Sequence, residues 1–539
     1  MRKIDIYDTT LRDGAQQQGV NFSVQDKLQI AELLQGFGVT FIEGGWPGAI
    51  LKDTSFFQQA SATFSEKLTA FGATRKPNVR VEDDAQVQAL LDSGTKTVCV
   101  VAKSDARHIS EALRTTVDEN LKMTSETVDA IVKSDKVAFV DAEHFFDGFR
   151  HSPDVAVEVV AAAFKAGAKC VILCDTNGGS LPSEIGATVA ETIRALEQKY
   201  NIKVSDSAED DAQYLGIHAH NDTGCAVANS IEAVKAGVAH VQGTINEFGE
   251  RTGNANLLTV IANLQLKLGI DCVPNLEKAY NLAHDVAEIA NVNINQRQPY
   301  VGDIAFAHKA GLHASAIKVN PDLYQHISPD LVGNDLRMII SEMAGKSSIA
   351  LKADELGFNL KDTPEVMERL TERVKALEAG GYAFDMADAS FELLLREELN
   401  LKPKYFNVES WRTISERQGP RGTEALSEAT VKLTYNDKRV IATGEGNGPV
   451  NALDEALRQA ISDFYPQVRN FVLKDYRVRL LDTSSGTDSI TRVLITCYNS
   501  DTNKSWSTVG VGGNIVESSW EALTDCYIYG LIQLGVVNG

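Results

Sequence analysis

The stretch GIHAHNDTG, residues 216–224, places two imidazole side chains, His218 and His220, one residue apart at the end of an apolar run. In a β-strand, side chains two residues apart point to the same face, so the two rings share a face and lie roughly 7 Å apart along the chain. Two neutral imidazoles at this spacing are half of a metal site. The alternative is that one histidine packs in a core and the other lies on the surface, so the surrounding sequence must decide between these interpretations.

The elements that position the two histidines belong to an alternation of β-rich runs and amphipathic helical stretches that begins at residue 4 and continues to residue 265 or so. The apolar residues of the helical stretches recur at helical spacing, and stretches such as 24–38 and 225–237 end in glycine, a common stop signal. The predicted strands are residues 4–10, 41–45, 68–74, 97–103, 137–143, 170–176, 215–221 and 241–249. This count and length predict a (β/α)8 TIM barrel. The alternative is an open doubly wound sheet, which has fewer strands and usually a glycine-rich first turn that is missing here.

The remainder of the chain predicts two further parts. Residues 271–402, after a barrel domain at 1–270, are mostly helical in pattern and predict a linker subdomain. Residues 403–539 contain an internal repeat, in which Gly444-Glu445-Gly446 recurs as Gly510-Val511-Gly512, each time after a strand pair and before a helix. We therefore predict a C-terminal α+β domain built from two ββα-type halves. A duplicated domain without chemical residues of its own indicates ligand sensing or dimerisation, with a plain scaffold as the alternative.

Composition narrows the class of protein. The chain has 539 residues, 43% apolar and 23% charged, with a net charge of −21 and no concentrated basic patch, which argues against binding to nucleic acid or a membrane surface. No apolar run is long enough to span a bilayer, and the polar start lacks a signal-peptide pattern, so we expect a cytoplasmic protein. The seven cysteines include no C-x-x-C pair, which suits a reducing compartment, and we interpret Cys170 and Cys174 as packing residues.

Hydrogen-bonding side chains stand at the ends of the predicted strands, where a barrel enzyme carries its active residues. They include Arg12, Asp13, Glu43, Asp141, Glu143, His144, Asp175, Thr176, Asn177, His218, His220, Asn246, Glu250, Arg251 and Asn254. Two histidines from one strand, a carboxylate from a second and an amide or carboxylate from a third form a mixed set that suits Mn²⁺, Mg²⁺ or Zn²⁺ with open positions. Such a metal can chelate a 2-oxo acid and polarise its keto carbon.

Two further features of this face have alternative interpretations. Arg12 adds a fixed positive charge where an alkoxide develops, or it closes the barrel through a salt bridge to Glu43 or Glu250, and both can hold together. The glycine-rich segment GERTGNAN, residues 249–256, opens the last barrel helix. Its backbone N–H groups can hold a CoA phosphate or a keto-acid carboxylate, or the segment is simply a tight turn.

These motifs carry a resemblance to a known family. The stretches YDTTLRDGAQQQG, EGGWPG, DAEHFFDGF, LCDTNGG, GIHAHNDTGCAVANSIEAVKAG, QGTINEFGERTGNANL and FAHKAGLHASAI resemble the citramalate synthase branch of the family that also contains isopropylmalate and homocitrate synthases. The resemblance spans nearly the whole chain, including the duplicated C-terminal domain. EGGWPG, Ala15 and DAEHFFDG favour the citramalate branch over the isopropylmalate branch.

The resemblance implies roles for individual residues. The implied ligands of a divalent metal are Asp13, His218, His220 and Asn254. The implied substrate-binding residues are Arg12, Thr176, Gln16 and His144. The implied catalytic residues are Arg12, Glu143, His313 and Tyr324. Glu143 and His313 are expected to take part in acid–base chemistry, and His313 and Tyr324 are expected to reach into the site of the partner subunit of a homodimer.

The resemblance also implies an activity, that of an acyltransferase. Acetyl-CoA and pyruvate undergo a Claisen-type condensation to (R)-citramalate and CoA in isoleucine synthesis, and isoleucine is the expected effector at the C-terminal domain. Three alternatives stay open: the use of 2-oxoisovalerate or 2-oxoglutarate, as in isopropylmalate or homocitrate synthases; a metal-dependent aldolase or lyase; and a non-catalytic amino-acid sensor on the same scaffold.

Overall fold

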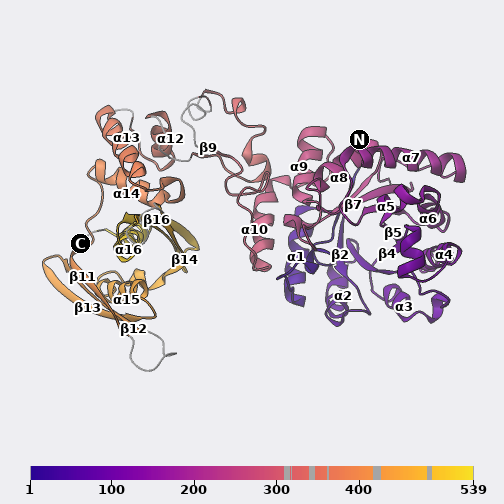
Figure 1. The fold of residues 1–539 in the computed structure, drawn as a ribbon, viewed down its shortest axis with the longest axis horizontal. Helices are drawn as coiled ribbons and strands as arrows, with labels where there is room; N and C mark the ends of the chain where they lie inside the picture. Colours follow the sequence, from indigo (N-terminus) through magenta and orange to yellow (C-terminus); the bar gives the residue numbers. More distant parts are fainter. Residues whose placement is uncertain are drawn as a thin grey trace. The chain divides into compact units, whose positions relative to one another are not determined.

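The computed structural model forms two compact units (Figure 1). The first comprises Met1–Phe306 and Ile327–Leu336, and the second comprises Ala307–His326 and Arg337–Gly539. The structure describes residues 2–537 except 210, 309–315, 317–318, 339–345, 361–362, 417–425 and 482–488. The domain limits at residues 270 and 402 stay predictions.

Eight parallel strands form a closed barrel in sequence order. They are β1 (Asp5–Asp8), β2 (Phe41–Gly45), β3 (Leu68–Ala73), β4 (Thr97–Lys103), β5 (Val137–Glu143), β6 (Cys170–Asp175), β7 (Tyr214–Ala219) and β8 (His240–Gly243). The barrel closes where β1 pairs with β8, with Asp5 opposite His240. The fold predicted from the alternation of strands and helices is therefore confirmed.

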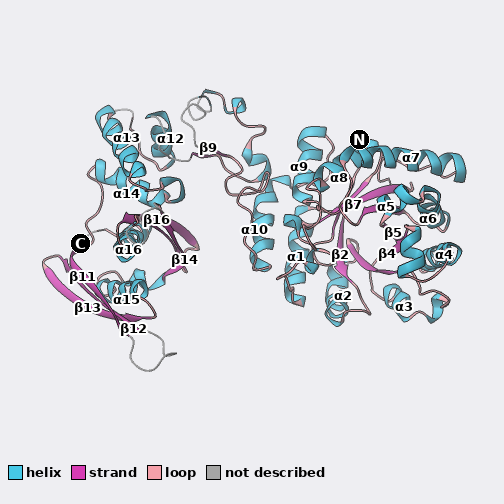
Figure 2. Cartoon of the chain, viewed as in Figure 1, coloured by secondary structure: helices cyan, strands magenta, loops and turns pink. Residues whose placement is uncertain are grey.

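Helices follow the strands and surround them (Figure 2). They are α1 (Val24–Phe37), α2 (Leu51–Phe64), α3 (Ala85–Leu91), α4 (Val117–Lys133), α5 (Phe145–His151), α6 (Pro153–Lys165), α7 (Pro182–Tyr200), α8 (Ala226–Ala236) and α9 (Leu257–Leu268). Helix α1 shows why these boundaries form: Ser23 and Asp26 make a reciprocal capping box at its start, and Gly38 ends it with a left-handed φ of 104°. The apolar faces of the helices pack on the strands in one continuous core.

The last strand is shorter than the predicted run 241–249. After β8 the chain turns through Asn246 and Glu247, whose φ angles are 57° and 62°, and a strand cannot continue through this left-handed backbone. The turn brings the chain back at Gly253, which has a φ of 88° and whose added Cβ would meet the Glu247 carbonyl oxygen at 1.8 Å. Only glycine fits there, and the segment then returns to the barrel mouth.

The first unit also contains α10 (Ala279–Ile289), which packs against α1. In the second unit, α12 (Lys346–Glu355), α13 (Pro364–Ala379) and α14 (Asp388–Glu398) share a small apolar core. These helices confirm the predicted helical character of this part of the chain.

The C-terminal part contains two three-stranded antiparallel sheets, each followed by a helix. The first half is β11 (Asn407–Glu416), β12 (Leu426–Tyr435), β13 (Lys438–Gly446) and α15 (Pro449–Ile461); the second is β14 (Phe471–Leu480), β15 (Thr491–Asn499), β16 (Lys504–Gly512) and α16 (Ile515–Gln533). The duplicated α+β domain is confirmed, but each half has one more strand than predicted. Both extra strands, β11 and β14, lie at a sheet edge, are largely exposed and contain a bulge, which interrupts the alternation of apolar and polar residues.

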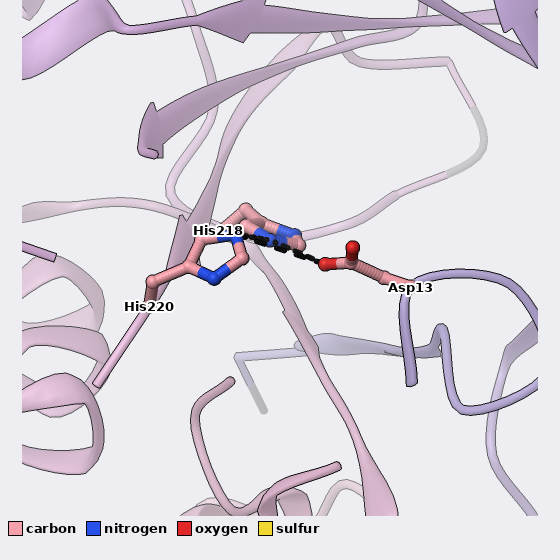
Figure 3. A group of neighbouring side chains, drawn as sticks. All are labelled: Asp13, His218 and His220. Atoms are coloured by element: carbon pink, nitrogen blue, oxygen red, sulfur yellow. Dashed lines mark hydrogen bonds and ion pairs between the residues drawn. The ribbon is translucent and has the colours of Figure 1, made fainter. Parts of the chain in front are cut away.

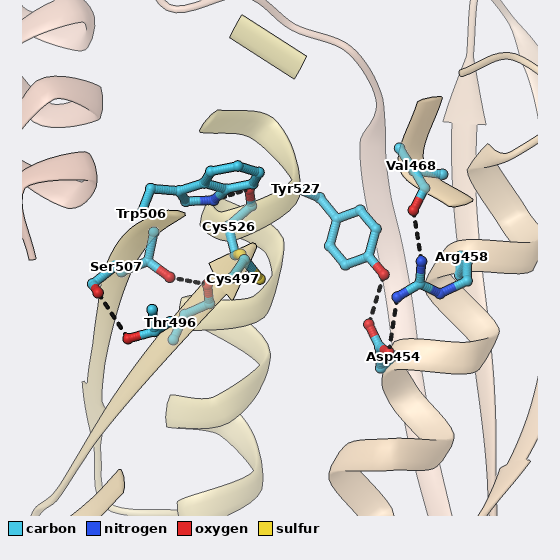
Figure 4. The surroundings of a disulfide bond; sticks show 11 residues. Asp454, Arg458, Val468, Thr496, Cys497, Trp506, Ser507, Cys526 and Tyr527 are labelled. Carbon is cyan, nitrogen blue, oxygen red and sulfur yellow. Dashed lines mark hydrogen bonds and ion pairs between the residues drawn. A yellow bond between two sulfur atoms is a disulfide. The ribbon is translucent and has the colours of Figure 1, made fainter. Parts of the chain in front are cut away.

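A disulfide joins Cys497 on β15 to Cys526 on α16 (Figure 4). Nearby, the indole N–H of Trp506, on β16, donates to the Cys526 carbonyl oxygen at 3.0 Å, so α16 is connected to both β15 and β16. Cysteine spacing alone did not predict this pair. Cys170 and Cys174 are buried in the barrel core, which confirms their packing role. Among the described residues, no helix is both long and apolar enough to cross a membrane.

Candidate active site at the mouth of the barrel

Three side chains converge where β1 and β7 end (Figure 3). The Nε2 atoms of His218 and His220 lie 3.2 Å apart, and Asp13 Oδ2 lies 3.3 Å from the first and 3.7 Å from the second. All three residues are at most 6% exposed. The two imidazoles therefore share a face as their spacing predicts, and a carboxylate from the turn after β1 meets them.

Asn254, the fourth predicted ligand, lies beside this group. Its backbone bridges to that of His220, and its amide N–H₂ group donates to the Phe248 carbonyl oxygen at 3.0 Å. The residue is fully buried, and its Oδ1 atom has no hydrogen-bond partner among the described residues. A buried amide oxygen without a partner is costly, and a cation ligand position would satisfy it.

The electrostatics of the group keep two lone-pair donors available. Burial raises the pKa of Asp13, but Arg12 and His218 outweigh burial and hold that pKa well below its ordinary range. Burial and the neighbouring His218 lower the pKa of His220 to about 3, so its ring is neutral at neutral pH. An ionised carboxylate beside a neutral imidazole is the donor set that Mn²⁺ or Zn²⁺ prefers.

Arg12 stands next to this group. Its guanidinium bonds Glu43 at 2.5 Å and approaches Asp13 at 3.2 Å, and its central carbon lies 3.9 Å from the centre of the Phe71 ring. Burial lowers the pKa of Arg12, but Glu43 and Asp13 outweigh it and raise the pKa above its ordinary value. The predicted bridge to Glu43 is confirmed, while a second side of the guanidinium faces the candidate ligands.

Glu43 is a fully buried hydrogen-bond acceptor that holds the Arg12 guanidinium. It accepts bonds from the Tyr7 hydroxyl and the Thr9 hydroxyl, each at 2.5 Å, in addition to the bond from Arg12. Three donors around one carboxylate fix its orientation. The guanidinium is therefore fixed in direction as well as in charge.

The neighbouring ends of β4 and β5 form a second part of the mouth. Lys103 pairs with Glu143, because the parallel register of these strands places the two residues opposite each other. The His144 backbone N–H donates to the Thr176 hydroxyl at 2.8 Å, and the His144 ring stacks on His108 with centroids 3.8 Å apart. Burial lowers the pKa of His144, so its ring is an uncharged neighbour of Glu143.

The glycine-rich segment 249–256 forms a turn braced by side chains. Arg251 donates to the Asp222 carboxylate at 2.9 Å and to the Thr176 carbonyl oxygen at 2.8 Å. Asn256 caps α9 by accepting the Thr259 backbone N–H. The segment therefore forms a tight turn, and whether it also holds a ligand stays a prediction.

The HMGL-like family model matches residues 3–291, the homocitrate synthase post-HMGL domain-like model matches 300–381, and the LeuA allosteric (dimerisation) domain model matches 385–531. The chain is 52% identical over 537 residues to an (R)-citramalate synthase of Streptomyces coelicolor, covering 98% of this chain and 97% of the relative. It is 45% identical to those of Aquifex aeolicus, with 98% of each covered, and of Synechocystis, with 99% and 97% covered. The chain belongs to the (R)-citramalate synthase family.

Three further residues have roles implied by the resemblance to this family, and they lie in different parts of the chain. Gln16 lies exposed on the turn that follows Asp13. Tyr324 belongs to the second unit, where it is 39% exposed. His313 lies outside the described residues. The roles of all three stay predictions.

The structure adds residues to the mouth that the motifs did not single out. Gln242 on β8 accepts a bond from the His218 ring, and Lys103 pairs with Glu143. A signal for Lys103 was present, since the ends of adjacent parallel strands come together and Lys103 and Glu143 both end predicted strands. Gln242 carried no such signal, because it stands inside its strand next to the apolar Val241.

Proposed function

We propose that this chain condenses acetyl-CoA with pyruvate to give (R)-citramalate and CoA. The observation that carries the proposal is the convergence of Asp13, His218 and His220 beside Arg12 at the barrel mouth, in a chain 52% identical to an (R)-citramalate synthase along almost its full length. The reaction is an acyl transfer that forms a carbon–carbon bond and releases CoA as a thiol.

The cation-binding part of the proposal rests on the fit of the side chains. Asp13, His218, His220 and the amide oxygen of Asn254 would hold one divalent cation, with Mn²⁺, Mg²⁺ and Zn²⁺ all compatible with two nitrogen and two oxygen donors. When bound there, such a cation supplies positive charge that polarises the keto group of pyruvate.

Side chains of the protein carry out the proton transfer and stabilise the developing negative charge. Arg12 directs a fixed guanidinium toward the oxygen that becomes an alkoxide as the carbon–carbon bond forms. Glu143 takes the proton from the acetyl methyl group, and Lys103 beside it holds the carboxylate in place. The resulting carbanion attacks the keto carbon, the alkoxide takes up a proton, and water then cleaves the thioester to free citramalate and CoA.

Regulation is assigned to the C-terminal part, which matches the LeuA allosteric (dimerisation) domain. We propose that this domain pairs two chains as a homodimer in the cytoplasm and binds isoleucine, the amino acid that citramalate leads to. Inhibition requires that isoleucine bind one conformation of the enzyme more tightly than another. His313 and Tyr324 would then complete the active site of the partner subunit.

A panel of 2-oxo acids tests the proposal. Free thiol released from acetyl-CoA is measured with pyruvate, 2-oxoisovalerate and 2-oxoglutarate, each with and without EDTA. We expect kcat/KM for pyruvate to exceed the others by about 100-fold or more, since the cost of placing extra carbons in a small pocket is a few kcal/mol. EDTA should abolish turnover. Equal or better turnover of 2-oxoisovalerate would reject pyruvate as the substrate, and thiol release that EDTA leaves unchanged would reject the metal.

A further inference from the structure

A chain of three buried side chains connects β5, β8 and β7 beneath the candidate metal ligands. The Gln242 carbonyl oxygen lies 2.7 Å from His218 Nδ1, and the Gln242 amide nitrogen lies 3.1 Å from Asp141 Oδ1. Gln242 is fully buried, while Asp141 and His218 are 4% and 5% exposed. Water is therefore excluded from these two bonds, and in each of them a donor must face an acceptor.

The direction of the hydrogen bonds follows from the chemistry of the three groups. An ionised carboxylate only accepts hydrogen bonds, and Asp141 Oδ1 lies within hydrogen-bond distance of the Gln242 amide. Gln242 must therefore turn its N–H₂ group toward Asp141, which leaves its carbonyl oxygen toward His218. A carbonyl oxygen accepts only, so His218 must carry a proton on Nδ1. Whenever this ring is neutral, as binding a cation requires, its lone pair then lies on Nε2, the atom that faces Asp13 and His220.

We propose that Gln242 and Asp141 are positioning residues that hold His218 in the tautomer and orientation required of a metal ligand. The inference rests on the proposed function, because it assigns a role toward the metal of that same site. His218 differs in this respect from His220, whose Nδ1 has no hydrogen-bond partner among the described residues. The position of the cation is therefore fixed mainly from the His218 side.

Metal affinity of the full-length protein, measured at pH 8 by titration with Mn²⁺ alone, tests the proposal without recourse to activity. Gln242→Met removes the acceptor for Nδ1–H and leaves the charge of the site unchanged, and we expect Mn²⁺ affinity to fall about 10- to 100-fold. Gln213→Met is the matched control: Gln213 makes two hydrogen bonds to backbone oxygens away from the mouth, and its loss should leave Mn²⁺ affinity unchanged.

A swap of the two groups tests the direction of the bonds. In Asp141→Asn the new amide can donate, so Gln242 is free to turn its N–H₂ group toward His218, and affinity should fall about 10-fold or more. In the double variant Asp141→Asn with Gln242→Glu, the Asn amide donates to the Glu carboxylate, which accepts from His218 again, and affinity should return to within about 3-fold of the wild type. Thermal unfolding of each variant confirms that it is folded.

The outcomes separate the two proposals. If the wild type fails to bind Mn²⁺, or if His220→Ala binds it as tightly, the metal site itself is wrong. If the wild type binds, His220→Ala does not, and folded Gln242→Met binds with wild-type affinity, then the positioning role alone is overturned. A folded double variant that stays as weak as Asp141→Asn also overturns it.

Discussion

Each end of the barrel contains a buried histidine side chain, but the two ends differ in the groups that surround it. Only the mouth has the arrangement expected of an active site. At the mouth, His218 and His220 meet a carboxylate, a guanidinium and an amide. At the opposite end, His240 at the start of β8 is fully buried, and both of its ring nitrogens lack a hydrogen-bond partner among the described residues. Its neighbours are aromatic rings: Tyr7, Phe41 and Phe139.

The difference between the ends lies in convergence and not in ionisation. Burial lowers the pKa of His220 and of His240 alike, to about 3 in each case. A shifted pKa alone would therefore rank the two residues equally. What distinguishes His220 is that its lone pair points where those of His218 and Asp13 also point, whereas His240 fills a hydrophobic end of the barrel.

The largest expected effect comes from removing a convergent imidazole. His220→Ala takes one ligand from the cluster and leaves Asp13 and His218 without their third partner, so we expect turnover of acetyl-CoA and pyruvate to fall about 1000-fold or more. Thiol release at saturating Mn²⁺ measures the loss. His240→Phe serves as the matched histidine variant and should keep turnover within about 2-fold. Equal losses in the two variants would remove the distinction between the ends.

A smaller loss is expected when the charge at the mouth is kept and its shape is changed. Arg12→Lys retains a cation but cannot contact Glu43 and the reacting oxygen with separate nitrogens, so kcat/KM for pyruvate should fall about 100-fold. Arg80→Lys, at a largely exposed arginine, is the control and should have no effect. Unchanged kinetics in Arg12→Lys would show that a point charge is sufficient there.

At the opposite end, His240 should affect the free energy of unfolding and not the turnover. The folded-state pKa of His240, about 3, lies below its ordinary value of 6.5. The contribution of His240 to the free energy of unfolding is therefore fully present above pH 6.5 and is lost as the pH falls toward 3. Between pH 6.5 and 5 the wild type should lose about 2 kcal/mol of unfolding free energy through this residue. His240→Phe should escape that loss. Urea unfolding at both pH values measures it, and an identical loss in both proteins would show that His240 is not the titrating group.

The barrel and most of the residues at its mouth could be predicted from the sequence, because the patterns that indicate them are local. Apolar spacing located every barrel strand, and the ends of strands located Arg12, Asp13, Glu143 and the histidine pair. The bonds from Gln242 to His218 and Asp141 join three separate strands, so they become visible only once the barrel is closed. The edge strands β11 and β14 were not predicted, because a bulge and solvent exposure interrupt their alternation of apolar and polar residues.

A crystal soaked with Mn²⁺ and recorded for anomalous scattering tests the central claim most directly. The account predicts one peak at the mouth of the barrel, about 2.0 to 2.3 Å from Nε2 of His218, Nε2 of His220 and a carboxylate oxygen of Asp13. Absence of a peak there at saturating Mn²⁺, or a peak bound by other side chains, would contradict it.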